Sequence, residues 1–423
     1  MDYRATLLLY FELLLALVLL WREGLLKNRT QQILALALVP LAFALRYCFL
    51  TYETLDFQDW IAAWIRSLRE AGPWKGLGGE IWSCNYNVPY LYFLALIAKS
   101  EISDLLLVKL LSIFFDIVLA WAVMRLVGVL TKGDPVRKLA AFVLTLWLPS
   151  VVLNGALWGQ CDCIYGAFAV LAVYLALDER PGLSVAAAAL SVSFKLQGIF
   201  LLPVYFIFLI SGRIRWKHIF IFPATYILSI LPAVFAGRGF WELLTLYARN
   251  TGSIGDGLNY NSSSMYALPC LDGLSGAAAG RLGIVLAFFF VCGLYAWLVI
   301  RLKDVNNRAL FGAAVLFAIG VPYFLPHMHD RYFFVADILT LALAVSAPAF
   351  SPVAVGVSFG SLLGYHAYLK MRYLMPMRYG AYAMLLALLL AVAYTALQLR
   401  PPKGSDTQES DEPPESLPEQ AKN

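Results

Sequence analysis

The chain has 423 residues, of which 61% are hydrophobic and only 14% are charged. A soluble globular protein carries about a quarter charged residues, so the composition excludes an ordinary soluble domain. The formal net charge of +5 is modest and is spread over several short loops, so nucleic acid is not an expected partner. The sequence therefore predicts an all-α, polytopic membrane protein.

The apolar segments are the first elements that the sequence predicts. About thirteen of them are candidate transmembrane helices, since spanning the hydrocarbon takes about 20 apolar residues. The first is longer than the apolar part of a signal peptide and has no small-residue cleavage site. They cover 5–21, 31–50, 104–130, 139–156, 163–178, 183–195, 198–211, 218–236, 281–300, 309–325, 332–347, 353–369 and 379–398.

We expect residues 1–400 to form one membrane domain. The remaining segment, 401–423, is rich in proline and acidic residues and has nothing to bury, which predicts a disordered cytoplasmic tail. Because basic loops stay in the cytoplasm, the chain should begin outside and end inside the cell. The basic clusters that set this orientation are Arg22/Lys27/Arg29, Lys132/Arg137/Lys138, Arg213/Arg215/Lys217 and Arg301/Lys303/Arg308.

Two segments do not fit simple spans. Residues 87–99 are too short to cross and are expected to be re-entrant or interfacial. The pair at 183–211 is also short, with Lys195 and Gln197 at its turn. Because irregular or short helices at membrane depth are tolerated where they line a watery cavity, we expect a cavity in the outer half of the protein.

The loop at 55–99 is the most informative segment of the chain. It holds Asp56 just past a predicted span, then an amphipathic aromatic helix and a Gly-rich turn, and it is longer than a simple connection requires. Ionisable groups near a bilayer usually face a cavity and a partner. The candidate site residues on this outer face are Asp56, Asp59, Gln160, Asp162, Lys195, Gln197, His327, His329, Asp330, Arg331 and Arg372.

Cysteines and aromatic residues leave alternatives open. The six cysteines lack metal-site spacing, and buried free thiols are the default interpretation. A disulfide between Cys84 and Cys161 is the alternative, because both fall on the same predicted face. The loop aromatics Trp60, Trp64 and Tyr86 fit an interfacial belt, or stacking on sugar rings.

Several motifs together carry a family resemblance over most of residues 50–345. DFQDWIAAW (56–64), GPWKGLG (72–78), NYNVPYLYFLALI (85–97), KLLSIFFDIVLAW (109–121), NGALWGQCD (154–162), FKLQGIFLLP (194–203) and PHMHDRYFF (326–334) follow in this order. The chain resembles the bacterial Gpi18-like mannosyltransferases, which belong to the GT-C superfamily of polyprenyl-phosphate-sugar glycosyltransferases. It departs from that pattern at Ala63, where proline is usual, and at Asp330, where glutamate is usual.

The resemblance implies transfer of a hexose from a polyprenyl-phosphate donor to an acceptor hydroxyl, with inversion, on the extracytoplasmic face of the cell membrane. Asp56 would be the catalytic base. Arg331 is the first choice to hold the phosphate, because its planar guanidinium can bind two oxygens, and Lys195, His329 and Arg372 are the other candidates. Asp59 would position the acceptor (a glycan, lipid or protein) or bind a divalent ion; no cofactor is otherwise implied.

Two other classes share these features. A transporter or flippase of a lipid-linked sugar would also have many spans and a charged cavity, but it should show two related halves, which the sequence lacks. A non-catalytic assembly subunit would give no reason for acids and arginines to gather on one face. The predicted function is therefore a membrane glycosyltransferase.

Overall fold

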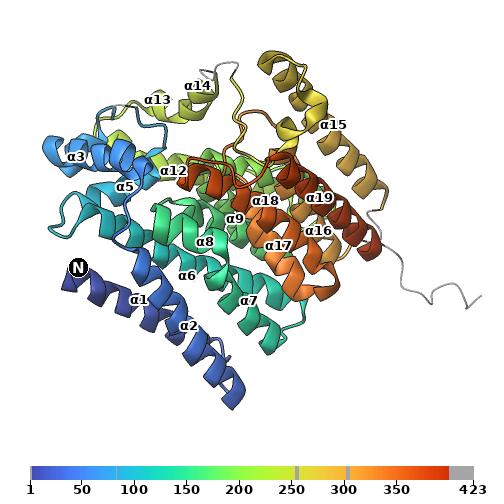
Figure 1. Cartoon of the computed structure of the whole chain (residues 1–423), viewed down its shortest axis with the longest axis horizontal. Coiled ribbons are helices and arrows are strands. Elements are labelled where there is room, and N and C mark those ends of the chain that lie inside the picture. The colour runs from blue at the N-terminus through green and yellow to red at the C-terminus, as the bar shows by residue number, and fades with distance from the viewer. Residues whose placement is uncertain (1, 82, 253–256, 302–304, 400–423) are drawn as a thin grey trace, which may run out of the picture.

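The computed structural model describes residues 2–81, 83–252, 257–301 and 305–399. These residues form an all-helical protein (Figure 1), which confirms the predicted fold class. The predicted tail at 401–423 lies outside the described residues. The α-helices are α1 (Tyr3–Arg22), α2 (Arg29–Phe49), α3 (Ala62–Ala71), α4 (Pro73–Leu77), α5 (Val88–Ile97), α6 (Asp104–Leu130), α7 (Pro135–Trp147), α8 (Pro149–Val152), α9 (Asp162–Leu177), α10 (Pro181–Phe194), α11 (Val204–Ile210), α12 (Ile221–Phe235), α13 (Phe240–Leu244), α14 (Leu246–Gly252), α15 (Gly276–Ile300), α16 (Asn307–Phe324), α17 (Phe334–Ser346), α18 (Ser351–Leu369) and α19 (Arg378–Gln398).

Each of the thirteen predicted segments matches a helix or a broken pair of helices. The boundaries follow local chemistry: Asn28 caps α2, and Asp134 caps α7 immediately before Pro135, a residue type favoured at the first helical position. The segment predicted at 139–156 is not one helix. It breaks between α7 and Pro149, with a bend of 46°, because proline cannot continue the hydrogen-bond ladder of a preceding helix.

The number of membrane crossings differs from the number of predicted segments. Seven helices in the described parts of the chain are long and apolar enough to span alone, or eight if the bent pair is one span. Helices α9, α10 and α17 have only 16, 14 and 13 residues. Shorter apolar helices of this kind need protein neighbours around their ends.

The helices sort into an interior and a periphery. In α6 and α16, 72% and 83% of the spanning window is buried within the protein. The window that includes α12 is only 17% buried, and that of α15 is 22% buried. Apolar side chains that face outward on these peripheral helices match a lipid environment, so α6 and α16 form the protein core and α12 and α15 cover it.

The two ends of the bundle carry different structures. Figure 1 shows α3, α5, α13 and α14 together at one end, toward the upper left of the view. Helix α9 starts at this end with Asp162, and α10 returns to it, so that Lys195 forms an ion pair with Asp162. We call this the site end. The turn between α9 and α10, at residues 178–180, lies at the opposite end.

All six cysteines are free. The disulfide left open between Cys84 and Cys161 is therefore wrong: the Cys84 thiol instead lies 3.8 Å from the carbonyl oxygen of Tyr86. Cys161 and Cys163 are buried as expected. Cys48, Cys270 and Cys292 are exposed, so the prediction of buried thiols is correct for only some of the six cysteines.

Candidate active site

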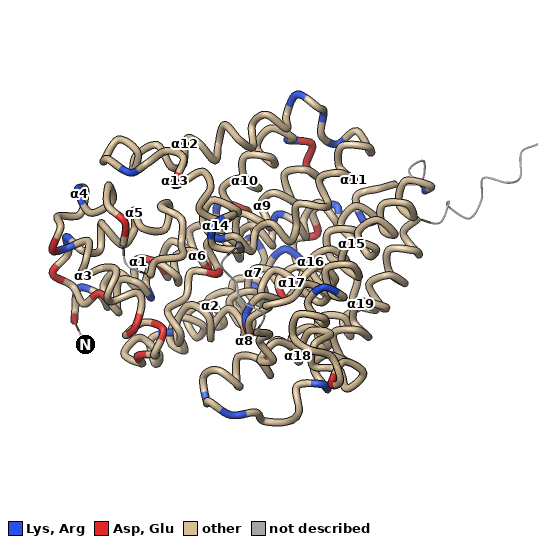
Figure 2. The backbone as a smooth tube through the Cα atoms, turned by 90° about the horizontal axis from the view of Figure 1, so that it is seen from above, with Lys and Arg blue, Asp and Glu red and all other residues tan. Residues whose placement is uncertain are grey.

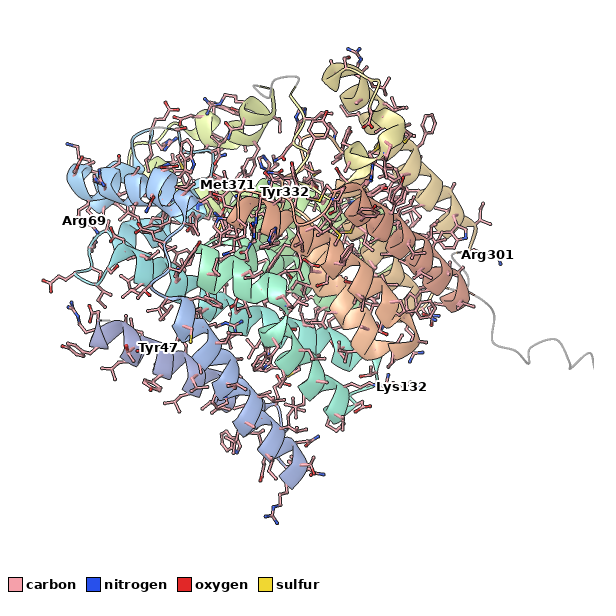
Figure 3. The ribbon with its side chains drawn as sticks, in the orientation of Figure 1. Tyr47, Arg69, Lys132, Arg301, Tyr332 and Met371 are labelled. Carbon is pink, nitrogen blue, oxygen red and sulfur yellow. The ribbon has the colours of Figure 1, made fainter. Side chains whose placement is uncertain are left out.

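A cavity of about 730 Å³ opens at the site end of the bundle. It draws residues from the loop before α3, the segment before α9, the loop before α17 and the end of α18. Figure 3 labels two of its lining residues, Tyr332 and Met371, beside each other and far from Lys132 and Arg301 at the other end. Its polar and charged lining residues are Asp56, Ser83, Asn85, Tyr86, Gln160, Asn259, Asn261, His329, Asp330, Arg331, Tyr332, Tyr368, Arg372 and Tyr373.

The backbone around Asp56 is held by buried polar contacts. Lys109, on α6, donates hydrogen bonds from Nζ to the carbonyl oxygens of Phe49 (2.6 Å) and Tyr52 (2.5 Å). Thr54 donates from its hydroxyl to the carbonyl oxygen of Trp158 across 3.0 Å. The chain then enters a π-helical turn immediately after Asp56, at Phe57–Ile61. Single π-turns occur frequently at functional sites, since they redirect a side chain locally.

A second π-turn, Leu153–Trp158, approaches Asp56 from the other side. It ends at Gly159, whose φ of +77° is strained for residues with a Cβ atom. The sharp exit turns Trp158 and Gln160 toward the carboxylate. Trp158 Nε1 and Gln160 Nε2 both donate to Asp56 Oδ2, at 3.0 and 2.8 Å.

The other carboxylate oxygen has a different partner. Tyr368, near the end of α18, donates its hydroxyl to Asp56 Oδ1 across 2.5 Å. A carboxylate offers about four lone-pair sites, and three donors occupy three of them. With 19% of its side chain accessible, Asp56 keeps one acceptor site that can reach the cavity.

Arg331 lies among three carboxylates. Its guanidinium nitrogens are 3.7 Å from Asp56, 3.5 Å from Asp162 and 3.6 Å from Asp330. The guanidinium carbon also lies 4.9 Å from the centre of the Trp158 ring, a cation–π distance. All three nitrogen–oxygen distances are longer than a typical hydrogen bond, so the guanidinium is held mainly by charge. Its N–H groups therefore remain available to an acceptor that can approach more closely.

Beneath this arginine lies a buried pair that does not reach the cavity. Asp162 is 1% exposed and binds Lys195 Nζ through Oδ1. Its Oδ2 accepts from Asn154 Nδ2 at 2.7 Å, and the same amide group contacts the hydroxyl of Tyr365 at 3.0 Å. Removing one partner of a buried ion pair typically costs about 3–5 kcal/mol. Asp162 and Lys195 therefore support the site rather than face a substrate.

Two titratable groups of the loop before α17 have shifted pKa values. Burial raises the pKa of Asp330 to about 6, and the nearby Asp56 and Asp162 charges add to the shift against the opposing effect of Arg331. The pKa of His329 is lowered to about 4 by desolvation, with further lowering by Arg331 and Lys195. The lowered pKa favours a neutral His329 ring, which lines the cavity and can offer a hydrogen bond.

The predicted site residues fall into three groups. Asp56, Gln160, His329, Asp330, Arg331 and Arg372 line the cavity. Asp162 and Lys195 lie directly behind it. The last group, Asp59, Gln197 and His327, is outside the lining: Asp59 is on the exposed side of the π-turn, Gln197 is half-buried in the 3₁₀ turn after Lys195, and His327 Nδ1 contacts the carbonyl oxygen of Gly257 at 2.8 Å.

Several residues that shape the site were not predicted from the sequence. Tyr368 lies in an apolar helix pattern. Its position just before the basic segment at 370–372 is the one feature of the sequence that could have indicated a role in the site. Trp158 and Asn154 were noted within a motif but without a role. Within the described ranges, no three His, Cys, Asp or Glu side chains are grouped to hold a metal ion, so the structure gives no ligand set for the divalent ion left open at Asp59.

Comparison with known proteins supplies the family. No curated protein matches the chain. The model of glycosyltransferase family 87 matches residues 86–326, which is more than half of the chain. The matched region contains the Trp158–Asp162 segment and the Lys195 turn, and it ends just before the loop with Arg331. Because this match covers more than half of the chain, the chain belongs to glycosyltransferase family 87.

Proposed function

We propose that this membrane glycosyltransferase moves a hexose, with mannose as the first candidate, from a polyprenyl-phosphate donor to an acceptor hydroxyl, with inversion, on the extracytoplasmic face of the cell membrane. The observation that carries the proposal is the Asp56 carboxylate, oriented by three donors and lining a cavity next to Arg331.

Asp56 is the proposed general base. The acceptor hydroxyl donates its proton to the carboxylate as its oxygen attacks the anomeric carbon. The bond between that carbon and the phosphate oxygen breaks, and its electron pair leaves with the polyprenyl phosphate. Attack opposite the leaving group inverts the anomeric configuration. Asp162 is less suited to this role because only 1% of its side chain is exposed, against 19% for Asp56.

The leaving phosphate requires positive charge where its negative charge develops. Arg331 is the proposed clamp, because its ion pairs are long and a phosphate can draw its N–H groups into shorter bonds. Arg372 is the proposed second contact. It lines the cavity, its side chain is exposed, and no acidic side chain in the described ranges lies within ion-pair distance of it.

Aromatic rings line the other side of the cavity. Trp60, Trp64 and Tyr86 lie in its wall, and the rings of Trp64 and Tyr86 pack at 5.5 Å. The Tyr86 hydroxyl donates to Gln160 Oε1 at 3.3 Å, which links this wall to the amide that binds Asp56. We propose that the sugar lies against this wall, with its anomeric carbon toward Asp56.

The deciding experiment uses the purified full chain with radiolabelled polyprenyl-phosphate mannose, polyprenyl-phosphate glucose and a nucleotide-activated mannose, each with candidate glycan, lipid and protein acceptors. We expect transfer from one polyprenyl-phosphate sugar only, with inverted product stereochemistry. Transfer from the nucleotide sugar alone would overturn the donor class. Movement of intact donor across vesicles without any product would favour a flippase.

A further inference from the structure

A second cavity, of about 470 Å³, lies at the opposite end of the bundle from the active site. It is formed where the turn between α9 and α10 meets the segment that follows α11. Its charged and polar lining consists of Glu179, Ser211, Arg213, Arg215, Lys217 and His218. Figure 2 shows basic residues gathered beside α11, with acidic residues close by. The proposed reaction uses none of these groups.

The backbone of this segment is fixed by one buried residue. Ile214 is 1% exposed, and its N–H donates to the carbonyl oxygen of Phe208 at 3.0 Å. Gly212, with φ of +75°, makes the turn that precedes it. Because Ile214 is anchored in the core, its neighbours Arg213 and Arg215 are held on the cavity wall.

The cavity has an excess of positive charge. Arg213 is 2.9 Å from Glu179, so this pair is balanced. For Arg215 and Lys217, no acidic side chain in the described part of the chain lies within 4 Å. Lys138, by contrast, lies 3.1 Å from Glu23. Arg215 and Lys217 therefore offer their charge to a ligand.

His218 adds a hydrogen-bond donor to the cavity wall. The backbone N–H of Arg215 donates to His218 Nδ1 at 3.1 Å, which leaves Nε2 of the ring as a donor. Ser211 also lines the cavity, but its hydroxyl already donates to the carbonyl oxygen of Phe208 at 3.2 Å. Two cations and a ring N–H are groups that bind phosphate oxygens.

The surroundings identify the source of that phosphate. Trp216 is 67% exposed and Phe220 is 64% exposed, and their rings meet edge to face at 6.0 Å. They begin an apolar span, Trp216–Phe235, of which only 17% is buried within the protein. Exposed tryptophan at the end of a lipid-facing helix marks the level of the headgroups. A phosphate bound here would therefore have acyl chains beside α12.

We propose that this cavity binds the headgroup of an anionic phospholipid, with Arg215 and Lys217 contacting its phosphate and its acyl chains lying along α12. The site is separate from the active site and does not depend on the identity of the transferred sugar. Helices α9 and α10 connect the two, since the site-end partners Asp162 and Lys195 lie at the far ends of the helices whose turn forms the cavity wall.

The test is native mass spectrometry of the full chain in detergent, titrated with phosphatidylglycerol or phosphatidylcholine of equal acyl length. The variant is R215Q/K217Q. The matched control is K27Q/R29Q, which removes two exposed charges outside the residues that line the cavity. We expect the wild type and the control to prefer phosphatidylglycerol. Two lost phosphate contacts should weaken phosphatidylglycerol binding by R215Q/K217Q about thirtyfold, with no change for phosphatidylcholine.

Competition with inorganic phosphate distinguishes a lipid headgroup from free phosphate as the ligand of the cavity. We expect millimolar phosphate to leave phosphatidylglycerol binding unchanged, because the acyl chains supply much of the affinity. Complete displacement by free phosphate would overturn the lipid assignment and make the cavity a soluble anion site. Equal losses of phosphatidylglycerol binding in R215Q/K217Q and K27Q/R29Q would also overturn the lipid assignment, because they would show a general effect of charge. Unchanged phosphatidylglycerol binding in R215Q/K217Q would overturn it as well.

Discussion

Tyr368 donates a hydrogen bond to Asp56 across 2.5 Å, although the two residues are 312 positions apart in the chain. The contact joins the last turn of α18 to the first π-turn of the protein. Trp158, which also donates to Asp56, stacks on the Tyr368 ring at 4.1 Å with an interplanar angle of 12°. The carboxylate is thus fixed by groups from two segments that are both distant from it in the chain.

We predict that Asp56→Asn is folded but nearly inactive. The amide keeps the size of the carboxylate, but it cannot accept a proton, and loss of a general base typically lowers the rate by about 10²–10⁴. The measurement is sugar transfer at matched expression. Asp59→Asn is the control and should lose less, because Asp59 lies outside the cavity lining. Wild-type turnover in Asp56→Asn would move the base to Asp330 or Asp162.

Tyr368→Phe should lower kcat by roughly tenfold or more, the effect of a lost hydrogen bond to a charged group. The KM for donor should change little, because the hydroxyl orients Asp56 and is not proposed to bind phosphate. Tyr373→Phe is the matched control, since its hydroxyl lies in the same cavity but donates to Asn261, at 2.6 Å, and not to Asp56. A rise in KM with unchanged kcat in Tyr368→Phe would contradict the positioning role.

Arg331→Lys keeps the charge but loses the planar guanidinium. We expect weaker donor use by roughly 1.5–3 kcal/mol, as for a lost charged hydrogen bond, seen as a higher KM in steady-state kinetics. Arg372→Gln should raise the donor KM with no effect on thermal stability, because Arg372 is exposed. If neither Arg331→Lys nor Arg331→Ala changes donor affinity or turnover, the phosphate clamp lies elsewhere.

Donor binding should depend on pH through Asp330. The pKa of this carboxyl is raised to about 6, so protonation below pH 6 removes one of the three negative charges around Arg331. The donor KM should then fall as the pH drops from about 7 to about 5. Asp330→Asn should show the low KM throughout this range. An identical pH profile in both proteins would exclude Asp330 as the cause.

The same group affects stability with a definite sign. Its folded pKa of about 6 lies above the ordinary value of 3.8, so the folded protein binds more protons than the unfolded chain between these pH values. The stability contributed by Asp330 therefore falls as pH rises from about 4 to about 6. Thermal unfolding of wild type and Asp330→Asn in detergent across this range should show that difference.

Topology is tested with native Cys270, which is exposed near the site end. With Cys48 and Cys292 replaced by serine, Cys270 should react with a membrane-impermeant maleimide in intact cells. In a C270S background, Pro135→Cys should react only after permeabilisation, because residue 135 follows a basic loop. The reverse pattern would place the active site in the cytoplasm.

The sequence predicted helices better than contacts. Long apolar runs such as 104–130 predicted a helix with the observed bounds, since the pattern is local. The break at Pro149 was missed, although proline signals it, because the apolar run continues across it. In the site, charged residues stood out against an apolar background. Tyr368 and Trp158 did not, because an aromatic residue in a membrane helix looks alike whether it faces lipid or a carboxylate.

Helices α9 and α10 have a consequence for where the reaction takes place. At 1.5 Å per residue, the 16 residues of α9 rise about 24 Å, whereas the hydrocarbon of a typical bilayer is about 30 Å thick. If the α9–α10 turn lies at one headgroup level, Asp162 and Arg331 lie several ångströms below the other. The proposed catalytic centre would then be recessed into the leaflet at the site end, and turnover should vary with acyl-chain length in reconstituted bilayers. In a thicker membrane, the distance between the aqueous phase and Asp56 would be larger, so a water-soluble acceptor would have farther to go to reach the carboxylate.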